Sequence, residues 1–153
     1  DSFKVAIIRP PMIYGPQCVG NYQRLSNVAK KINVFPKVNN KRSMLYIDNL
    51  HCFVKVIIDN QLNGTFHPQN KVLVNTSLMV NEIAKFHSRN IYLIKGFDTL
   101  ISKLSEHSKL LQKVFGTLFY DSTLEGYPES IFNNVKFDYQ IRDFKTSIEE
   151  SEK

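Results

Sequence analysis

Hydrophobic and polar residues alternate along the chain in blocks that predict strands and helices in turn. Residues 5–8 form a continuous apolar run rich in β-branched side chains, typical of a strand covered on both faces in a parallel sheet. Residues 9–16 hold three prolines and one glycine, and they predict a loop that ends this strand. Apolar side chains at helical spacing then predict a helix over about residues 22–32.

The middle of the chain repeats this rhythm. A turn over residues 36–41 leads to a short predicted strand at 43–47. The clearest helix follows, and Asp48 is expected to cap its first turn. Its apolar stripe consists of Leu50, Phe53, Val54, Ile57 and Ile58.

Further strands and helices are predicted toward the C-terminus. Ser77 is expected to cap a helix that carries Met79, Ile83 and Phe86. A longer helix is expected over residues 100–115, and a terminal amphipathic helix over 143–153, with Phe144 and Ile148 facing inward. The predicted strand segments are 65–67, 72–75, 91–94 and 118–120.

Length and composition favour one globular domain. The chain has 153 residues, 42% of them hydrophobic, which is enough to build a core and excludes a disordered chain. Its apolar runs are all shorter than the roughly 18 residues of a membrane-spanning helix, so no membrane association is expected. Because the sequence starts at Asp1 and enters a strand almost at once, we expect it to begin inside a longer protein.

Two cysteines are too few for a disulfide scaffold. Cys18 and Cys52 are therefore expected to be free thiols. No leader pattern opens the sequence, and together these features favour a reducing cytoplasm as the location of the protein.

The net charge of +6 raises the question of a nucleic-acid or other anionic ligand. The basic residues are scattered singly or in pairs, and there is no arginine-rich helix, no aromatic-basic RNA-binding signature and no zinc-finger spacing. Nucleic-acid binding is therefore not expected, and an acidic partner domain would balance the charge equally well.

Catalytic and metal-binding patterns are absent from the local sequence. The four histidines and two cysteines show no nucleophile–base pairing, and no cluster has the ligand spacing of a zinc or calcium site. The glycine-rich turn that binds a dinucleotide pyrophosphate is also missing. We therefore predict no catalytic residue and no metal ligand within the chain.

Arg42, at the edge of a predicted strand, is a candidate ligand group. A guanidinium presents a planar fork of donors that fits two phosphate oxygens, so an arginine at a sheet end can clamp a diphosphate. Arg9 ends the first strand and is placed similarly. The alternative is that Arg42 is a solvated surface side chain, and the spacing alone leaves both interpretations open.

Three ordered segments resemble the extended short-chain dehydrogenase/reductase family of nucleotide-sugar epimerases and dehydratases. They are Arg-Pro-Pro-Met-Ile-Tyr-Gly-Pro at residues 9–16, Gly-Asn-Tyr at 20–22 and Arg-Ser-Met-Leu-Tyr-Ile-Asp-Asn-Leu at 42–50. Residues 115–122 also resemble a late family segment, so the likeness covers nearly the whole chain. It is greatest to epimerases that act on UDP-glucose.

The resemblance implies an α/β fold in which residues 1–153 form the C-terminal, substrate-binding part of a Rossmann-type protein. One sheet strand would be an orphan, and several helices would surround it. The N-terminal NAD-binding domain and the family's Tyr-x-x-x-Lys pair would lie outside these residues. In the family, NAD takes a hydride from the sugar and returns it to the opposite face. The chain alone is therefore expected to be inactive.

The resemblance also assigns roles to individual residues. Pro10 and Pro11 resemble the strand-end residues that pack beside the nicotinamide of NAD. Asn21 and Tyr22 match the helix start that lies along the nucleotide. The remaining two assignments are Phe35 in the segment lining the uracil pocket and Arg42 as the diphosphate-binding arginine.

The chain departs from the family pattern at two points. Met12 stands where epimerases often carry an asparagine, and a thioether cannot donate the corresponding hydrogen bond. The second diphosphate arginine has no clear counterpart near residues 113–121, where Lys113 would serve as a point charge. These departures favour a branch of the family, such as one in surface-polysaccharide synthesis.

Several functions remain open at this level. The expected one is the UDP-sugar-binding half of an NAD-dependent epimerase. Alternatives are part of a nucleotide-sugar dehydratase or keto-sugar reductase, or a binding module without chemistry. Exposed apolar surface around the orphan strand predicts a homodimer or another form of self-association.

Overall fold

Strands that are distant in the sequence lie side by side in the computed structural model, which describes residues 3–97, 103, 108 and 114–153. The parallel pairs are β1 (Ala6–Ile8) with β5 (Gly64–Phe66), β2 (Met12–Tyr14) with β4 (Met44–Tyr46), and β3 (Val34–Pro36) with β6 (Tyr92–Ile94). An antiparallel hairpin joins β7 (Ile131–Phe132) to β8 (Val135–Lys136). Along the sequence, at least one helix lies between the two strands of each parallel pair, as expected for a crossover connection.

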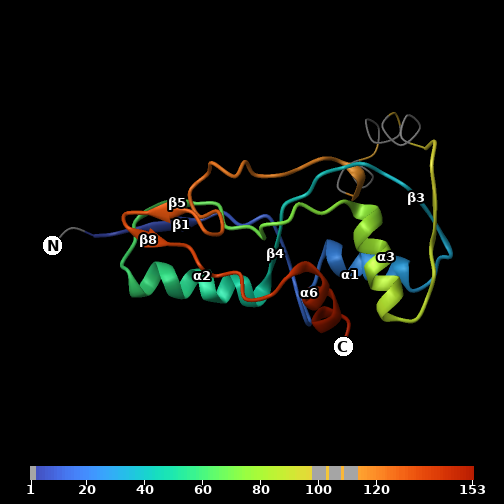
Figure 1. Cartoon of the computed structure of the whole chain (residues 1–153), viewed down its shortest axis with the longest axis horizontal. Helices are drawn as coiled ribbons and strands as arrows, with labels where there is room; N and C mark the ends of the chain where they lie inside the picture. The colour runs from blue at the N-terminus through green and yellow to red at the C-terminus, as the bar shows by residue number, and fades with distance from the viewer. Residues whose placement is uncertain (1–2, 98–102, 104–107, 109–113) are drawn as a thin grey trace.

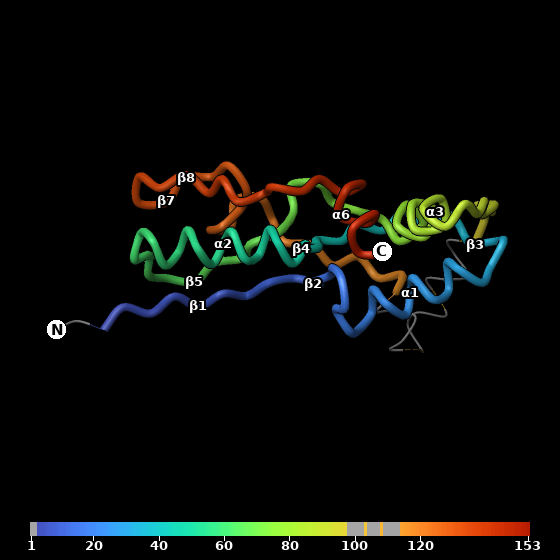
Figure 2. Tube along the Cα trace, turned by 90° about the horizontal axis from the view of Figure 1, so that it is seen from below, coloured from blue at the N-terminus to red at the C-terminus, as the bar shows by residue number. Residues whose placement is uncertain are grey.

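The helices gather toward opposite ends of a long axis (Figure 1). The helices are α1 (Asn21–Ala29), α2 (Ile47–Asp59), α3 (Thr76–Phe86) and α6 (Phe144–Ser151). Figure 1 shows α2 at one end with β1, β5 and the β7–β8 hairpin, and α1, α3 and α6 in the other half. The side view in Figure 2 shows α2 between the hairpin and β1. The mixed α/β fold expected from the sequence is confirmed.

Strand β4 separates two hydrophobic clusters. Met44 and Tyr46 belong to the cluster around α1, α3 and α6, whereas Leu45 belongs to the cluster around α2 and β5. Successive side chains of a strand point to opposite faces, so this three-residue strand contributes to both cores. All three side chains are buried, and β4 lies inside the predicted strand at 43–47.

Two helix caps differ from the predicted ones. Asn75, not Ser77, caps α3, because its side-chain oxygen accepts the N–H of Leu78 at 2.7 Å. Ser77 instead accepts the N–H of Val38 at 2.8 Å, which ties the loop after β3 to the helix. Helix α2 begins at Ile47 without a side-chain cap, and Asp48 lies in its first turn.

Some predicted strands and loops were also wrong. β2 forms inside the segment 9–16 that was predicted as a loop, because Pro10 and Pro11 precede the paired residues and Pro16 follows them, so no proline removes a bond of the ladder. Residues 72–75 and 118–120 form only isolated bridges, in which Val74 and Leu118 pair with Arg42. Most of the helix predicted over 100–115 lies outside the described residues.

The expected orphan strand is paired on one side. β1 pairs with β5 over its three residues, and its other edge has no partner in the described part of the chain. The burial of this strand differs from the prediction of two covered faces, since Val5 and Ile7 are about half exposed. Figure 1 places this edge at the end of the molecule where the chain starts.

Candidate ligand-binding site

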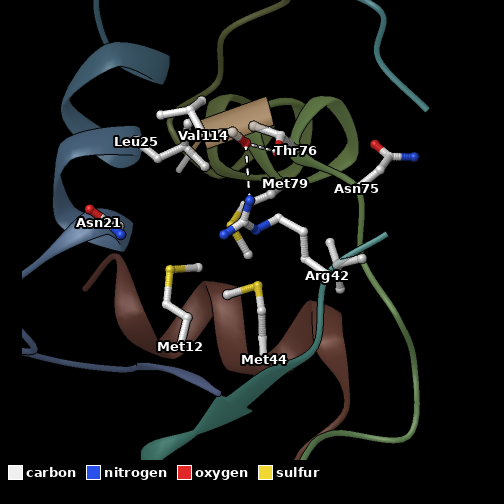
Figure 3. A pocket seen from close by; sticks show the side chains of 10 residues that line it. Met12, Asn21, Leu25, Arg42, Met44, Asn75, Thr76, Met79 and Val114 are labelled. Atoms are coloured by element: carbon white, nitrogen blue, oxygen red, sulfur yellow. Dashed lines mark hydrogen bonds between the residues drawn. The ribbon is translucent and has the colours of Figure 1, made fainter. Parts of the chain in front are cut away.

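A pocket lies where α1, α3 and the paired strands β2 and β4 meet. Its lining consists of Met12, Asn21, Leu25, Arg42, Met44, Val74, Asn75, Thr76, Met79 and Val114. In Figure 3 the Arg42 side chain extends between the two helices, with Met12 and Met44 on one side and Thr76 and Val114 on the other. The pocket thus contains two residues assigned by the resemblance, Asn21 and Arg42.

Parallel pairing brings the two key sequence segments to the same edge. Met12 pairs with Met44 in the first position of the β2–β4 ladder. Pro10 and Arg42 each come two residues before a member of that pair. Both segments therefore enter neighbouring strands from one end, and the proline pair and the arginine lie beside the same pocket.

The Arg42 backbone is fixed by a two-way bridge. Its N–H donates to the carbonyl of Val74 at 2.9 Å, and its carbonyl accepts the N–H of Val74 at 3.0 Å. The guanidinium Nη1 donates to the carbonyl of Gly116 at 2.8 Å and lies 3.5 Å from that of Val114. Backbone carbonyls thus orient one edge of the guanidinium, and within the described residues its other N–H groups have no hydrogen-bond acceptor.

The charge of Arg42 has no acidic partner in the described part of the chain. No carboxylate lines the pocket, and no ion pair involves this arginine among the described residues. Partial burial lowers the pKa of the guanidinium, yet an arginine stays protonated at any physiological pH. A half-buried cation that faces apolar side chains is favourable only with an anion or strong acceptors beside it.

Neighbouring polar residues hold the loop that carries Arg42. Asn40 is buried, and its side chain accepts the N–H of Thr76 and donates to the Thr76 hydroxyl, both at 2.9 Å. The Thr76 hydroxyl in turn donates to the carbonyl of Val114 at 2.7 Å. This network ties the loop to the start of α3, so the position of the guanidinium is well defined before any ligand arrives.

The start of α1 adds a second electropositive group. Gly20 precedes the helix with φ of 127°, a backbone conformation that favours glycine. No side chain caps this end, and no acidic residue lies in the first turn. The first N–H groups of the helix are therefore without a side-chain acceptor, and Asn21 at this end lines the pocket beside Arg42.

Three methionines form the apolar part of the lining. Met44 and Met79 are buried and Met12 is partly buried. The interior of the pocket is about 30 Å³, room for one or two water molecules. Methionine side chains adapt readily to a ligand. A phosphate group or part of a sugar fits this space better than a whole nucleotide does.

The other residues assigned by the resemblance lie around the pocket rather than in it. Pro10 and Pro11 are partly buried between β1 and β2. Tyr22 is buried, and its hydroxyl donates to Glu152 at 2.8 Å, so this side chain is engaged within the fold rather than in the pocket. Phe35 is buried against Phe115, with ring centroids 5.8 Å apart.

Sequence reasoning missed most of the α3 side of the pocket. Asn75 was expected in a strand and Met79 in a helix, and Thr76 was assigned to neither, although all three line the pocket. Their local signal was the polar start of a helix directly after a short apolar run. That pattern predicts a helix cap. Nothing in it indicates that Arg42 lies across a pocket from this helix start.

The described residues contain neither a metal site nor a membrane-spanning helix. Within these residues no cluster of three or more His, Cys, Asp or Glu side chains is arranged to hold a metal ion. Both Cys18 and Cys52 are free thiols, as expected. No helix among the described residues is long and apolar enough to cross a membrane. Lys113, considered as a substitute for the second arginine, lies outside the described residues.

One curated protein with a similar sequence is an epimerase. The chain is 30% identical over 129 residues to a UDP-glucose 4-epimerase of Vibrio cholerae. The alignment covers 79% of this chain and 39% of that protein, so the chain spans well under half of the relative's length. No family model matches the chain.

Solved structures share the fold. UDP-N-acetylglucosamine 4-epimerase from Bacillus cereus matches 97% of this chain and 47% of its own, with a TM-score of 0.63 and 14% identity. A dTDP-4-dehydrorhamnose reductase from Clostridium acetobutylicum matches 60% of this chain and 32% of its own, with a TM-score of 0.51 and 20% identity. The sequence match and the shared fold together support an epimerase-like fragment of the extended short-chain dehydrogenase/reductase type.

Proposed function

We propose that this chain binds the nucleotide-sugar substrate, a UDP-sugar, of an NAD-dependent epimerase. The observation that carries the proposal is the Arg42 guanidinium, which has no acidic partner in the described part of the chain, beside the start of α1, which has no side-chain cap. A diphosphate offers negative charge and several acceptor oxygens, which both groups are suited to bind. The epimerase relatives give the substrate class its support.

The geometry suggests how a substrate would lie. With the diphosphate at Arg42, the sugar would extend toward Met12 and the prolines, and the nucleoside toward the opposite side, past Asn75. Met12 and Met44 would pack against apolar parts of the sugar ring and exclude water. Thr76 and Asn40 would act indirectly, because they hold the Arg42 loop in place.

The residues of this chain can form only part of an NAD site. Pro10 and Pro11 fit one rigid wall beside a nicotinamide, since their backbone is fixed and partly buried. The sequence contains no glycine-rich turn for the pyrophosphate of NAD. Bound NAD supplies the hydride chemistry in this family. We therefore propose that the chain alone holds substrate without epimerising it.

Two alternatives share the same pocket. A dehydratase or a keto-sugar reductase would use the same diphosphate clamp, and the fold is also similar to that of a dTDP-4-dehydrorhamnose reductase. A binding module without chemistry would keep the pocket as well. We also propose a cytoplasmic location, with which the free thiols are consistent. A role of the epimerase in polysaccharide synthesis is part of the proposed function.

The proposal predicts that Arg42 controls nucleotide affinity. The change Arg42→Gln should weaken the binding of UDP-glucose by about 10- to 100-fold, because it removes a charge-assisted hydrogen-bond donor to the diphosphate. Arg42→Lys should cost less, since the point charge stays and the planar fork is lost. Isothermal titration calorimetry, supported by ligand-observed NMR at millimolar UDP-glucose, measures both effects.

Arg24 provides the matched control for this experiment. It is an exposed arginine on α1 without an ion pair in the described part of the chain, so Arg24→Gln changes the net charge equally. We expect its affinity to stay within about twofold of the unchanged chain. Micromolar binding by the chain would favour a self-sufficient module, and millimolar binding a half-site. An affinity for UDP-glucose that Arg42→Gln leaves unchanged would contradict the proposal.

The open edge of β1 predicts self-association. Phe3, Val5 and Ile7 on this strand segment and Ile58 on α2 are exposed apolar side chains, and an unpaired strand edge can add a strand from a second copy. We expect a concentration-dependent dimer in sedimentation velocity. Ile7→Lys should reduce dimer formation, because it places a charge on that edge. A strictly monomeric profile at about 100 μM would contradict this prediction.

A further inference from the structure

A second groove adjoins the Arg42 pocket on the side of Asn75. It has a volume of about 410 Å³ and is lined by Lys37, Val38, Asn39, Asn75 and Lys95. Asn75 lines both hollows, so they share a wall. In Figure 3 Asn75 lies across Arg42 from Met12 and Asn21, so the groove continues the pocket away from the proposed sugar end.

Two lysines stand side by side in this groove. Pro36 pairs with Ile94 at the end of the parallel strands β3 and β6, and the N–H of Lys37 donates to the carbonyl of Ile94 at 2.8 Å. Lys37 and Lys95 therefore occupy the next positions of neighbouring strands, which lie about 4.8 Å apart. Like charges placed opposite each other on paired strands destabilise the pairing.

No acidic group of the described chain relieves this repulsion. The groove has no carboxylate in its lining, and neither Lys37 nor Lys95 takes part in an ion pair among the described residues. Lysines elsewhere on the surface differ in this respect: Lys55 pairs with Asp59 and Lys85 with Glu82. The groove therefore concentrates positive charge that the described residues leave unbalanced.

The polar atoms of the groove are mainly hydrogen-bond donors. Each lysine ammonium has three donors and no acceptor. The side-chain oxygen of Asn75 already accepts the N–H of Leu78, which leaves its NH₂ group to face a ligand. A group with negative charge and several acceptor oxygens, such as a phosphate, complements this lining best.

We propose that the Lys37–Lys95 groove is a second anion subsite, which binds a phosphate group beyond the diphosphate at Arg42. The proposal rests on the proposed function only in treating the groove as a continuation of the substrate site. The phosphate can be carried by a nucleotide with an additional phosphate or can be free in solution. Both sources present the same chemistry to the two lysines.

The test titrates inorganic phosphate into the chain saturated with UDP, at low and constant ionic strength. The double variant Lys37→Gln/Lys95→Gln should bind phosphate at least tenfold more weakly than the unchanged chain. The control Lys55→Gln/Lys145→Gln removes the same net charge from exposed lysines elsewhere and should stay within twofold. Phosphate should also raise the melting temperature of the unchanged chain more than that of the lysine-pair variant.

A second arm identifies the source of the phosphate. If a nucleotide carries it, the phosphate must be on the ribose, because the nucleoside side of the substrate faces this groove. Uridine 5′-diphosphate with an additional 3′-phosphate should then bind about tenfold more tightly than UDP, and the lysine-pair variant should remove this advantage. If the phosphate is free, the 3′-phosphorylated nucleotide and UDP should bind equally while phosphate still binds to the UDP-saturated chain. Both results support the subsite, whereas phosphate affinity that is unchanged in the lysine-pair variant overturns it.

Failure of the substrate proposal gives a different result. In that case UDP binding does not respond to Arg42→Gln, and the phosphate titration is then made without UDP. The lysine-pair variant still decides the subsite, because the groove contains neither Arg42 nor Asn21. Each proposal can therefore fail while the other stands.

Discussion

Replacing Glu152 by alanine is expected to lower the free energy of unfolding by about 3 kcal/mol. The side chain of this glutamate is only 1% exposed. Its carboxylate accepts hydrogen bonds from Tyr22 and Ser26 at 2.8 Å and also contacts Lys30 and His87 at 2.8 Å. Removing it would leave the hydroxyls of two buried residues without their acceptor, whereas Lys30 can still reach water.

The contacts of Glu152 join three helices. Tyr22, Ser26 and Lys30 lie on or just after α1, His87 follows α3, and Glu152 itself follows α6. Because α1 and α3 supply the two sides of the Arg42 pocket, the same change should also weaken UDP-glucose binding. This effect would be indirect, since Glu152 does not line the pocket.

Glu149 is the matched control for this prediction. It lies on α6, is about half exposed, and contacts only Lys145 at 3.9 Å among the ion pairs described. Glu149→Ala should therefore change the free energy of unfolding by less than about 0.5 kcal/mol. Urea unfolding followed by circular dichroism measures both variants. Equal stability of the two variants would show that the buried carboxylate is not a stabilising contact.

The same carboxylate predicts sensitivity to acid. Burial raises the pKa of Glu152, but the four donors around it have the larger combined effect and hold this pKa below its ordinary value of 4.5. A carboxylate whose pKa is lower in the folded state stabilises the protein above its unfolded pKa. We therefore expect the difference between the unchanged chain and Glu152→Ala to shrink as the pH falls below about 4.5.

Phe53→Ala is expected to cost about 4 kcal/mol, the largest effect of any single change considered. Phe53 lies on α2 and is fully buried. Its ring centroid is 4.9 Å from that of Tyr139, 5.4 Å from that of Phe137 and 6.1 Å from that of Phe66. The truncation leaves a cavity between the helix, β5 and the segment after β8, which cannot close without moving all three.

The control for this prediction lies on the same helix. Ile58 was predicted to share the apolar stripe with Phe53 but is 67% exposed, so Ile58→Ala should cost less than about 0.5 kcal/mol. Thermal and urea unfolding give both values. If Phe53→Ala cost no more than Ile58→Ala, the cluster around α2 would not be a core of the fold.

Local patterns predicted most of the helices and several strands. The starts and ends of α1, α2 and α3 lie within a few residues of the predicted ranges, and β4 and β6 lie inside predicted strands. Asp143 caps α6, and Ile148 of that helix faces inward, as the amphipathic pattern of the tail indicates. These features depend on spacing within one segment, which a sequence displays directly.

The β7–β8 hairpin was missed although a signal for it existed. Asn133 and Asn134 connect the two strands, and both have positive φ, at 49° and 63°. Asparagine tolerates this conformation, and two such residues between short apolar pairs favour a tight hairpin turn. The strands have two residues each, too few for a period-two pattern to be recognised.

The candidate site was predictable only in part. Arg42 was recognised from its place before a strand and from the resemblance, and Asn21 from the resemblance, and the structure brings both to one pocket. The burial of Tyr22 and Phe35 could not be foreseen, because it depends on Glu152 and Phe115, which lie far away in the sequence. The roles assigned to Pro10, Pro11, Tyr22 and Phe35 remain predictions.

By itself the sequence determined the order of strands and helices, the positive net charge and the resemblance to nucleotide-sugar epimerases, because each is a property of residues near one another in the chain. The tertiary structure decided which strands pair, which helix starts face Arg42, and which carboxylate holds α1 against α3. The physical reason is that these contacts join residues many positions apart. Their energies depend on burial and distance, which exist only after the chain has folded.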